Sequence, residues 1–300
     1  VTGNASPRIT VNSNITTAEN ITITGETENG SYFSPLTAAG SGASQGTYNG
    51  TITLAGSGNI RIGPANWTGT ITQSGTSHKL IFVGASNTVS NPMTINGADL
   101  TIGEGTTTLN GVNPTDGSGI GSTDIYAFSG TTTLRLGVTN AIRTDRDLTF
   151  NNTATVRLDL NGKDQTIRGL ITTTGSNTRT VNNDANNGST STLTVGNGGG
   201  DYTFGGTIIN ATTGSGTVAL VKTGAGNQTL TGTNTFTGGT RIDNGILTLG
   251  HATDTLANTG AVNVNGGTLA LGANTDTVGA VTLTSGSITS STGVLTGASY

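Results

Sequence analysis

Short segments of alternating apolar and polar residues, separated by turn-forming residues, recur along this sequence and constrain its fold more than any other feature. The alternation has a period of two, for example in residues 51–54, 80–83 and 156–160, and this period places apolar side chains on one face of a β-strand. Glycine, asparagine, serine and aspartate cluster between the segments, as expected for tight turns. We find no long segment with the 3.6-residue periodicity of an amphipathic helix, so the pattern predicts an all-β chain.

The composition limits how thick the core of such a fold can be. Of the 300 residues, 64 are threonine, 49 glycine, 31 asparagine and 23 serine, whereas hydrophobic residues make up 31% and aromatic residues 4%. A conventional globular domain of this length needs more large apolar side chains than the chain supplies. Disorder is disfavoured as well, because disordered chains are rich in proline and glutamate, and this chain has 5 prolines and 4 glutamates. These numbers favour a thin, repetitive β structure with a narrow core.

An internal repeat near the C-terminus indicates how the strands are arranged. Residues 244–256 align without gaps with residues 266–278, and seven of the thirteen aligned positions are identical. A repeat spacing of about 20 residues, with strand and turn content, is typical of β-solenoids, in which consecutive coils stack. We therefore predict a single parallel β-helix over residues 1–300, with about 14 coils of roughly 20 residues and its most regular coils in residues 244–295. The main alternative is a β-sandwich of hairpins, since Asn-Gly and Asp-Gly pairs also occur.

Residues 220–250 carry the motif LVKTGAGNQTLTGTNTFTGGTRIDNGILTLG. They resemble the autotransporter-associated β-strand repeat, a family whose motif fixes leucines, glycines, an aromatic residue and single lysine, asparagine and threonine positions. The matching positions are Leu220, Lys222, Gly224, Gly226, Leu230, Gly232, Asn234, Phe236, Gly238, Thr240, Ile242, Gly245 and Leu247. The resemblance implies a right-handed parallel β-helix in a large bacterial surface-exposed or secreted protein, whose passenger region contains the repeat. It also implies that the repeat is associated with folding and export.

The motif positions have architectural roles that elementary chemistry predicts. We expect Phe236 to fill the narrow interior where a coil turns, and the amide of Asn234 to cap backbone groups at a turn. Gly232, Gly238 and Gly239 are predicted to permit left-handed turn conformations. The motif therefore predicts a structural element of the solenoid.

Candidate catalytic and metal-binding residues have simpler explanations. Parallel β-helices include polysaccharide-cleaving enzymes, and hydrolysis by such enzymes requires two or three carboxylates on one face. Residues 274–276 match one short motif of such hydrolases, but Asp254 takes the place of Asp276 in the preceding repeat, which favours a repeated turn feature. His78 and His251 have no acidic residue at metal-ligand spacing, and the chain has no cysteine. We therefore predict no catalytic, cofactor-binding or metal-binding residue, and no cofactor.

Charge excludes some partners. The net charge is −4 and no basic patch is present, which removes the electrostatic basis for binding nucleic acid. No run of 18 apolar residues occurs, so we expect no membrane insertion of this segment. Nine charged residues, five basic and four acidic, gather within residues 143–168. Their near balance predicts mixed charge on the solvent face of adjacent coils.

The function that follows is that of a non-enzymatic, extracellular structural protein at a bacterial cell surface. We expect a surface adhesin or a fibre subunit, which associates end to end with copies of itself or contacts a glycan or protein of a host or cell surface. Two alternatives remain: a polysaccharide-processing β-helix enzyme, and an ice-binding protein that presents threonine pairs on a flat solenoid face.

Overall fold

The computed structural model describes residues 9–11, 16–17, 20–25, 36–38, 46–56, 58–74, 78–94, 99–111, 123–125, 130–151, 155–173 and 178–300. These residues form strands, turns and irregular segments without a helix, so none of them builds a helix long and apolar enough to cross a membrane. The chain divides into two compact units, and we describe each separately. The first comprises Val1–Arg143 and Thr153–Thr155, and the second comprises Thr144–Asn152 and Val156–Tyr300.

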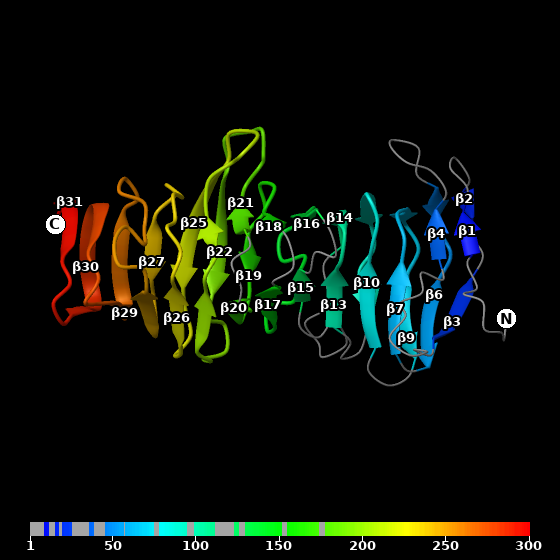
Figure 1. Cartoon of the computed structure of the whole chain (residues 1–300), viewed down its shortest axis with the longest axis horizontal. Coiled ribbons are helices and arrows are strands. Elements are labelled where there is room, and N and C mark those ends of the chain that lie inside the picture. The colour runs from blue at the N-terminus through cyan, green and yellow to red at the C-terminus, as the bar shows by residue number, and fades with distance from the viewer. Residues whose placement is uncertain are drawn as a thin grey trace. The chain divides into compact units, whose positions relative to one another are not determined.

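In the first unit, short parallel strands return to the same sheets coil after coil (Figure 1). One sheet has the order β1-β4-β7-β10-β13-β15, a second the order β2-β5-β8-β11-β14-β16, and a third the order β12-β9-β6-β3. The strands are β1 (Ile9–Val11), β2 (Thr16–Thr17), β3 (Ile21–Gly25), β4 (Leu36–Ala38), β5 (Thr47–Tyr48), β6 (Ile52–Gly56), β7 (Gly58–Ile62), β8 (Asn66–Trp67), β9 (Ile71–Ser74), β10 (His78–Phe82), β11 (Ser86–Val89), β12 (Met93–Thr94), β13 (Asp99–Ile102), β14 (Gly105–Leu109), β15 (Thr123–Ile125) and β16 (Thr131–Leu136).

The second unit has the same parallel character. Its sheets contain the pair β17-β20, the series β18-β21-β24, and the series β19-β22-β25-β27-β29-β28-β26-β23, with β30 between β29 and β31. The strands are β17 (Asp147–Phe150), β18 (Thr155–Asp159), β19 (Gln165–Thr166), β20 (Gly169–Thr172), β21 (Arg179–Asn182), β22 (Thr190–Val195), β23 (Tyr202–Phe204), β24 (Thr207–Ile208), β25 (Thr217–Lys222), β26 (Asn227–Leu230), β27 (Thr240–Ile242), β28 (Ile246–Leu249), β29 (Val262–Gly272), β30 (Asp276–Ser290) and β31 (Leu295–Ser299).

Strand registers confirm the predicted solenoid. Ile246 of β28 pairs with Thr268 of β29, and these are two positions that the sequence repeat aligns with each other. Leu220 of β25 pairs with Thr240 of β27. The spacing of these two residues along the chain is similar to that between Ile246 and Thr268. The strand pairs determined for the described residues are parallel, which excludes the alternative sandwich of hairpins.

The predicted number of coils was too high. The described residues form about ten turns of a β-solenoid and not fourteen. The difference arises because many coils are longer than the C-terminal repeat. Thr16 pairs with Thr47, and Thr190 pairs with Thr217, so the chain makes a longer circuit in both coils than it does between Ile246 and Thr268. Loops that leave the corners of a coil add residues without adding a turn.

The core of each unit is narrow and is filled by alternate residues of the strands. In β25, the side chains of Val218, Leu220 and Lys222 are buried, whereas the intervening side chains are partly exposed. Aromatic rings stack between coils: Tyr48 and Trp67 lie 5.9 Å apart in the first unit. In the second unit, Phe150 and Phe204 make an edge-to-face contact at 5.3 Å. A few aromatic residues therefore suffice to fill a core of this width.

Candidate functional site

The candidate site is the segment of residues 220–249 in the second unit, which makes one coil and begins the next. Strands β25, β26, β27 and β28 build it, and β22, β25, β27 and β29 run side by side on one face (Figure 1). The structure buries all five apolar positions of the motif in this segment: Leu220, Leu230, Phe236, Ile242 and Leu247. The segment thus encloses an apolar interior, and its polar motif residues determine how successive coils contact one another.

Lys222 is a completely buried cation that joins two coils. Its Nζ donates hydrogen bonds to the carbonyl oxygens of Thr223 at 2.5 Å, Gly224 at 2.9 Å and, on the next coil, Asn244 at 3.2 Å. Burial lowers the pKa of Lys222 to about 8, against a smaller opposing effect of Asp201, so the amine is mostly protonated at neutral pH. An ammonium group has three N–H donors, and three carbonyl groups accept them. No donor remains for a substrate.

Glycines surround this ammonium because the backbones come too close for any side chain. A Cβ at Gly224 would lie 1.7 Å from the carbonyl oxygen of Gly196, and one at Gly226 would lie 2.1 Å from that of Gly200. At Gly245, a Cβ would lie 2.3 Å from the Gly224 oxygen and 2.7 Å from the Lys222 Nζ. Gly224 and Gly245 also have φ values of 64° and 63°, in the region that favours glycine.

Asn234 connects three successive coils through its side-chain amide. Its Oδ1 accepts the N–H of Ile208 at 2.7 Å from the preceding coil. Its Nδ2 donates to the carbonyl oxygen of Gly232 at 3.0 Å and to that of Thr255, on the following coil, at 2.6 Å. The side chain is buried, so these bonds satisfy backbone groups that water does not reach.

Two of the three glycines predicted to adopt left-handed conformations do not. Only Gly239 has a positive φ, of 93°. Gly232 and Gly238 are required for a different reason, which is close packing of coils. A Cβ at Gly232 would lie 2.0 Å from the carbonyl oxygen of Gly206, and one at Gly238 would lie 2.4 Å from that of Val218.

Gln228 makes a further bridge between coils, which was not predicted. Its Oε1 accepts the N–H of Leu170 at 3.2 Å, and its Nε2 donates to the Leu170 carbonyl at 3.0 Å. The two residues are far apart in the sequence but close in the second unit. The residues of β26 are alternately partly exposed and buried. This period of two is the sequence signal that places Gln228 on the inward face of the strand.

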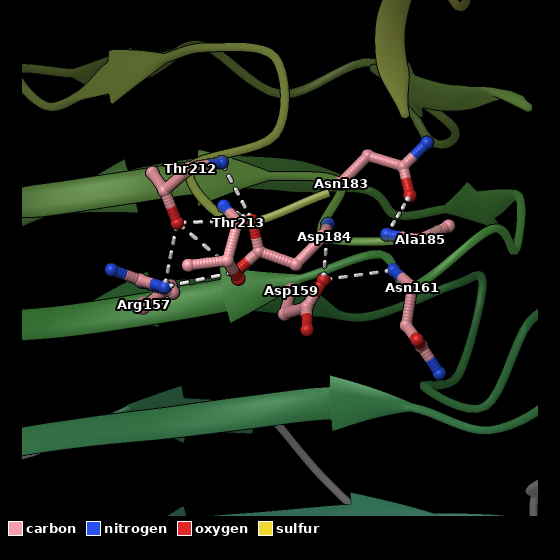
Figure 2. A network of polar contacts seen from close by, with 8 residues as sticks. All are labelled: Arg157, Asp159, Asn161, Asn183, Asp184, Ala185, Thr212 and Thr213. Atoms are coloured by element: carbon pink, nitrogen blue, oxygen red, sulfur yellow. Dashed lines mark hydrogen bonds and ion pairs between the residues drawn. The ribbon is translucent and has the colours of Figure 1, made fainter. Parts of the chain in front are cut away.

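Figure 2 shows a second polar network, which includes part of the charged segment 143–168. Asp159 is fully buried, and its Oδ1 accepts the N–H groups of Asn161 and Asp184, both at 3.0 Å. The prediction of a solvent face is therefore wrong for Asp159, because a carboxylate that accepts backbone N–H groups can be buried between coils. Arg168 does follow the prediction of mixed charge on adjacent coils, since its partly exposed guanidinium makes two bonds to Asp147 at 2.9 and 2.7 Å.

Asp184 anchors the loop of the next coil in the same network (Figure 2). Its Oδ1 accepts the N–H groups of Thr212 at 2.6 Å and Thr213 at 3.0 Å, and Arg157 pairs with its Oδ2 at 3.1 Å. Burial alone would raise the pKa of Asp184, but the hydrogen bonds from Thr213 and Thr212 outweigh burial and lower it. Both oxygens of the Asp184 carboxylate are therefore occupied by contacts that hold the fold together.

The remaining candidates for chemistry are also tied to the backbone. Asp254 lies in a turn with a φ of 51°, whereas Asp276 is 1% exposed at the start of β30; the two are therefore not equivalent turn residues as predicted. The Nδ1 of His251 contacts the Thr253 carbonyl, and the side chain of His78 lies outside the described residues. In the part of the chain that the structure describes, no three His, Asp or Glu side chains converge as metal ligands would.

Comparisons with known proteins agree with this geometry. Residues 220–249 match the passenger-associated-transport-repeat family, which confirms the resemblance found in the motif. Neither the curated proteins nor the solved structures give a match. The repeat and the β-solenoid fold fit a passenger domain of an autotransporter.

Proposed function

We propose that this chain is a passenger-type β-solenoid of an exported bacterial surface protein and that its role is structural and not enzymatic. The observation that carries the proposal is the match of residues 220–249 to the passenger-associated-transport-repeat family, on a segment that forms a coil of the solenoid. The family suggests a secreted or surface location. Burial of Asp276, Asp159 and Lys222 supports a non-enzymatic role, because these charged groups cannot contact a polysaccharide.

Surface display tests the proposed location. With the chain inserted between a secretion signal and a translocating β-barrel in a Gram-negative host, we expect it to bind antibody added outside intact cells. It should also leave a protease-resistant core there. Retention of the wild-type chain inside the cells, with the empty carrier displayed normally, would contradict the proposal.

The finer role that we propose is end-to-end association into a fibre. In the two successive coils that contain β30 and β31, the apolar side chains of Leu283, Val294 and Tyr300 are exposed by 52%, 54% and 81%. The register partner of Leu283 on the preceding coil, Val264, is fully buried. A further parallel coil stacked on this end would cover these side chains and pair with β31, and in the proposed fibre a second copy supplies that coil. Contact with a glycan or protein at a cell surface, as in an adhesin, is the other role consistent with such a scaffold.

Sedimentation velocity over a concentration series tests the association. We expect the wild-type chain to form larger species as its concentration rises, and Leu283→Asn to shift this rise to at least tenfold higher concentration. Ile246→Asn is the matched control, since Ile246 is also exposed, by 39%, but lies on an inner coil. A wild-type chain that sediments as a monomer throughout would contradict the fibre role without affecting the surface location.

The alternative of an ice-binding face has weaker support. Thr22, Thr53, Thr72 and Thr94 follow one another in register in the first unit. In the second unit, however, Thr192 is followed by Ala219 and Thr194 by Val221. The threonine pairs therefore do not continue from coil to coil there, as a flat ice-binding surface would need.

A further inference from the structure

Asp276 repeats the backbone contacts of Asn234 at a later coil. The Oδ1 of Asn234 accepts the Ile208 N–H of the preceding coil, and the Oδ2 of Asp276 accepts the Leu256 N–H of its own preceding coil at 2.9 Å. The backbone N–H of Asn234 bonds to the Thr255 carbonyl of the following coil, and that of Asp276 bonds to the Val294 carbonyl. Both side chains are 1% exposed.

The two side chains differ in the other terminal atom of their planar amide or carboxyl group. In Asn234 this atom is Nδ2, which donates to two carbonyl oxygens, one of them on the following coil. In Asp276 it is Oδ1, which is buried and has no hydrogen-bond partner among the described residues. An ionised carboxylate has no proton to donate, whereas a protonated carboxyl has one O–H donor. Protonation would therefore give Asp276 the donor that Asn234 has permanently.

The surroundings of Asp276 favour the protonated form. Burial raises the pKa of Asp276 to about 6; the N–H groups of Leu256, Thr255 and Thr277 oppose this rise, and the nearby Asp254 charge adds to it. On the preceding coil, His251 is the other titratable group, and its Nδ1 contacts the Thr253 carbonyl. On the following coil, residues 291–300 contain no charged side chain. Among the described residues, no cation pairs with Asp276 to offset the cost of burying its charge.

We propose that Asp276 is a proton-dependent clamp, which in its protonated form holds the coil of β31 to the preceding coil as the amide of Asn234 does, and which releases that coil when the proton is lost. The Val294 carbonyl is the acceptor that corresponds to the Thr255 carbonyl, because each already accepts the backbone N–H of the clamp residue. The released proton goes to solvent, and no other bond is made or broken.

The direction of the pH dependence follows from linkage. The pKa of Asp276 is higher in the folded coil, about 6, than the ordinary value of 3.8, so the folded coil binds more protons between these values. The stability of the coil is therefore highest below about pH 4, decreases as the pH rises toward 6 and stays low above it. The difference between the two values corresponds to a change of about a hundredfold in the equilibrium between closed and open coils.

Hydrogen exchange of backbone amides tests the clamp. Protection factors, which are corrected for the intrinsic pH dependence of exchange, are measured for the amides of Asp276, which bonds to the Val294 carbonyl, and of β31 at pH 4, 5, 6 and 7.5. We expect protection of these amides in the wild-type chain to fall by about a hundredfold over this range. In Asp276→Asn, we expect it to remain high and constant, since the amide donates at every pH.

The reciprocal substitution separates the clamp from general effects of pH. Asn234→Asp should introduce the same loss of protection with rising pH at the backbone amide of residue 234, which bonds to the Thr255 carbonyl of the following coil, and should leave the pH dependence at β31 unchanged. Wild-type protection at β31 that does not change with pH, or Asp276→Asn protection that falls with pH as in the wild type, would overturn the proposal. So would an Asp276→Asn variant that is less protected than the wild type at pH 7.5.

Discussion

Replacing Lys222 by methionine is expected to lower the free energy of unfolding of the second unit by about 4 kcal/mol. Methionine retains the apolar stem but removes the ammonium group that satisfies the carbonyls of Thr223, Gly224 and Asn244. A buried acceptor left without its donor costs roughly 1–3 kcal/mol, and here three are left. The substitution also removes the cost of burying a charge, but this recovers only part of the loss, because the three carbonyl groups remain buried without a donor. Urea unfolding followed by circular dichroism measures the effect.

Lys163→Met is the matched control for Lys222→Met. Lys163 is also a lysine of the second unit but is only partly buried, so we expect a change below about 0.5 kcal/mol. Hydrogen exchange should place the loss in Lys222→Met at the amides of β25 to β28 and their neighbours. If Lys222→Met unfolds at the same urea concentration as Lys163→Met, the three carbonyl bonds do not hold these coils together.

Replacing Gly224 by alanine is expected to lower the free energy of unfolding of the second unit by about 3 kcal/mol or more. Its Cβ would lie 1.7 Å from the Gly196 carbonyl oxygen, so the backbones of two coils must move apart, and the hydrogen bonds between them must lengthen. Gly224 also has a φ of 64°, which costs alanine about 1–2 kcal/mol by itself. Thermal unfolding and limited proteolysis of the purified variant measure the combined effect.

Gly272→Ala separates the two contributions. Gly272 has nearly the same φ, 61°, but nothing lies within 4 Å of its Cβ position, so only the conformational cost of about 1–2 kcal/mol is expected. A larger effect at Gly224 than at Gly272 therefore measures the close approach of the coils. Equal effects at the two positions would mean that the coils near Gly196 are less tightly packed than the structure has them.

The arrangement of the strands could be predicted because the two sequence features that indicate it, the alternation within strands and the C-terminal repeat, are both local. Period-two alternation identifies strands, and the alignment of 244–256 with 266–278 reproduces the register of β28 on β29. The number of coils could not be predicted in the same way, since loops of variable length separate the strands. Thus Thr190 pairs with Thr217 across a longer coil, and no repeat in the sequence reveals its length.

The polar interior was harder to predict, because it depends on which side chains turn inward. Strand parity places Lys222 on the same face as Val218 and Leu220, but its three carbonyl acceptors come from the turns of two coils. The comparison of Asp254 with Asp276 was misleading for a related reason. The backbone N–H of Asp254 bonds to the carbonyl of Thr275, and Asp254 turns outward in a left-handed bend while Asp276 begins a strand and is buried.

Parallel stacking of the coils around residues 220–249 underlies every conclusion about the clamp, the glycines and the passenger repeat, and a distance between spin labels tests it most directly. Thr194, Val221, Arg241, Asn263 and Thr282 follow one another in register across β22, β25, β27, β29 and β30. With neighbouring strands about 4.8 Å apart, labels at Thr194 and Thr282 should show a narrow distribution centred at about 20 Å. A broad distribution, or one centred far beyond this distance, would contradict the stacked solenoid.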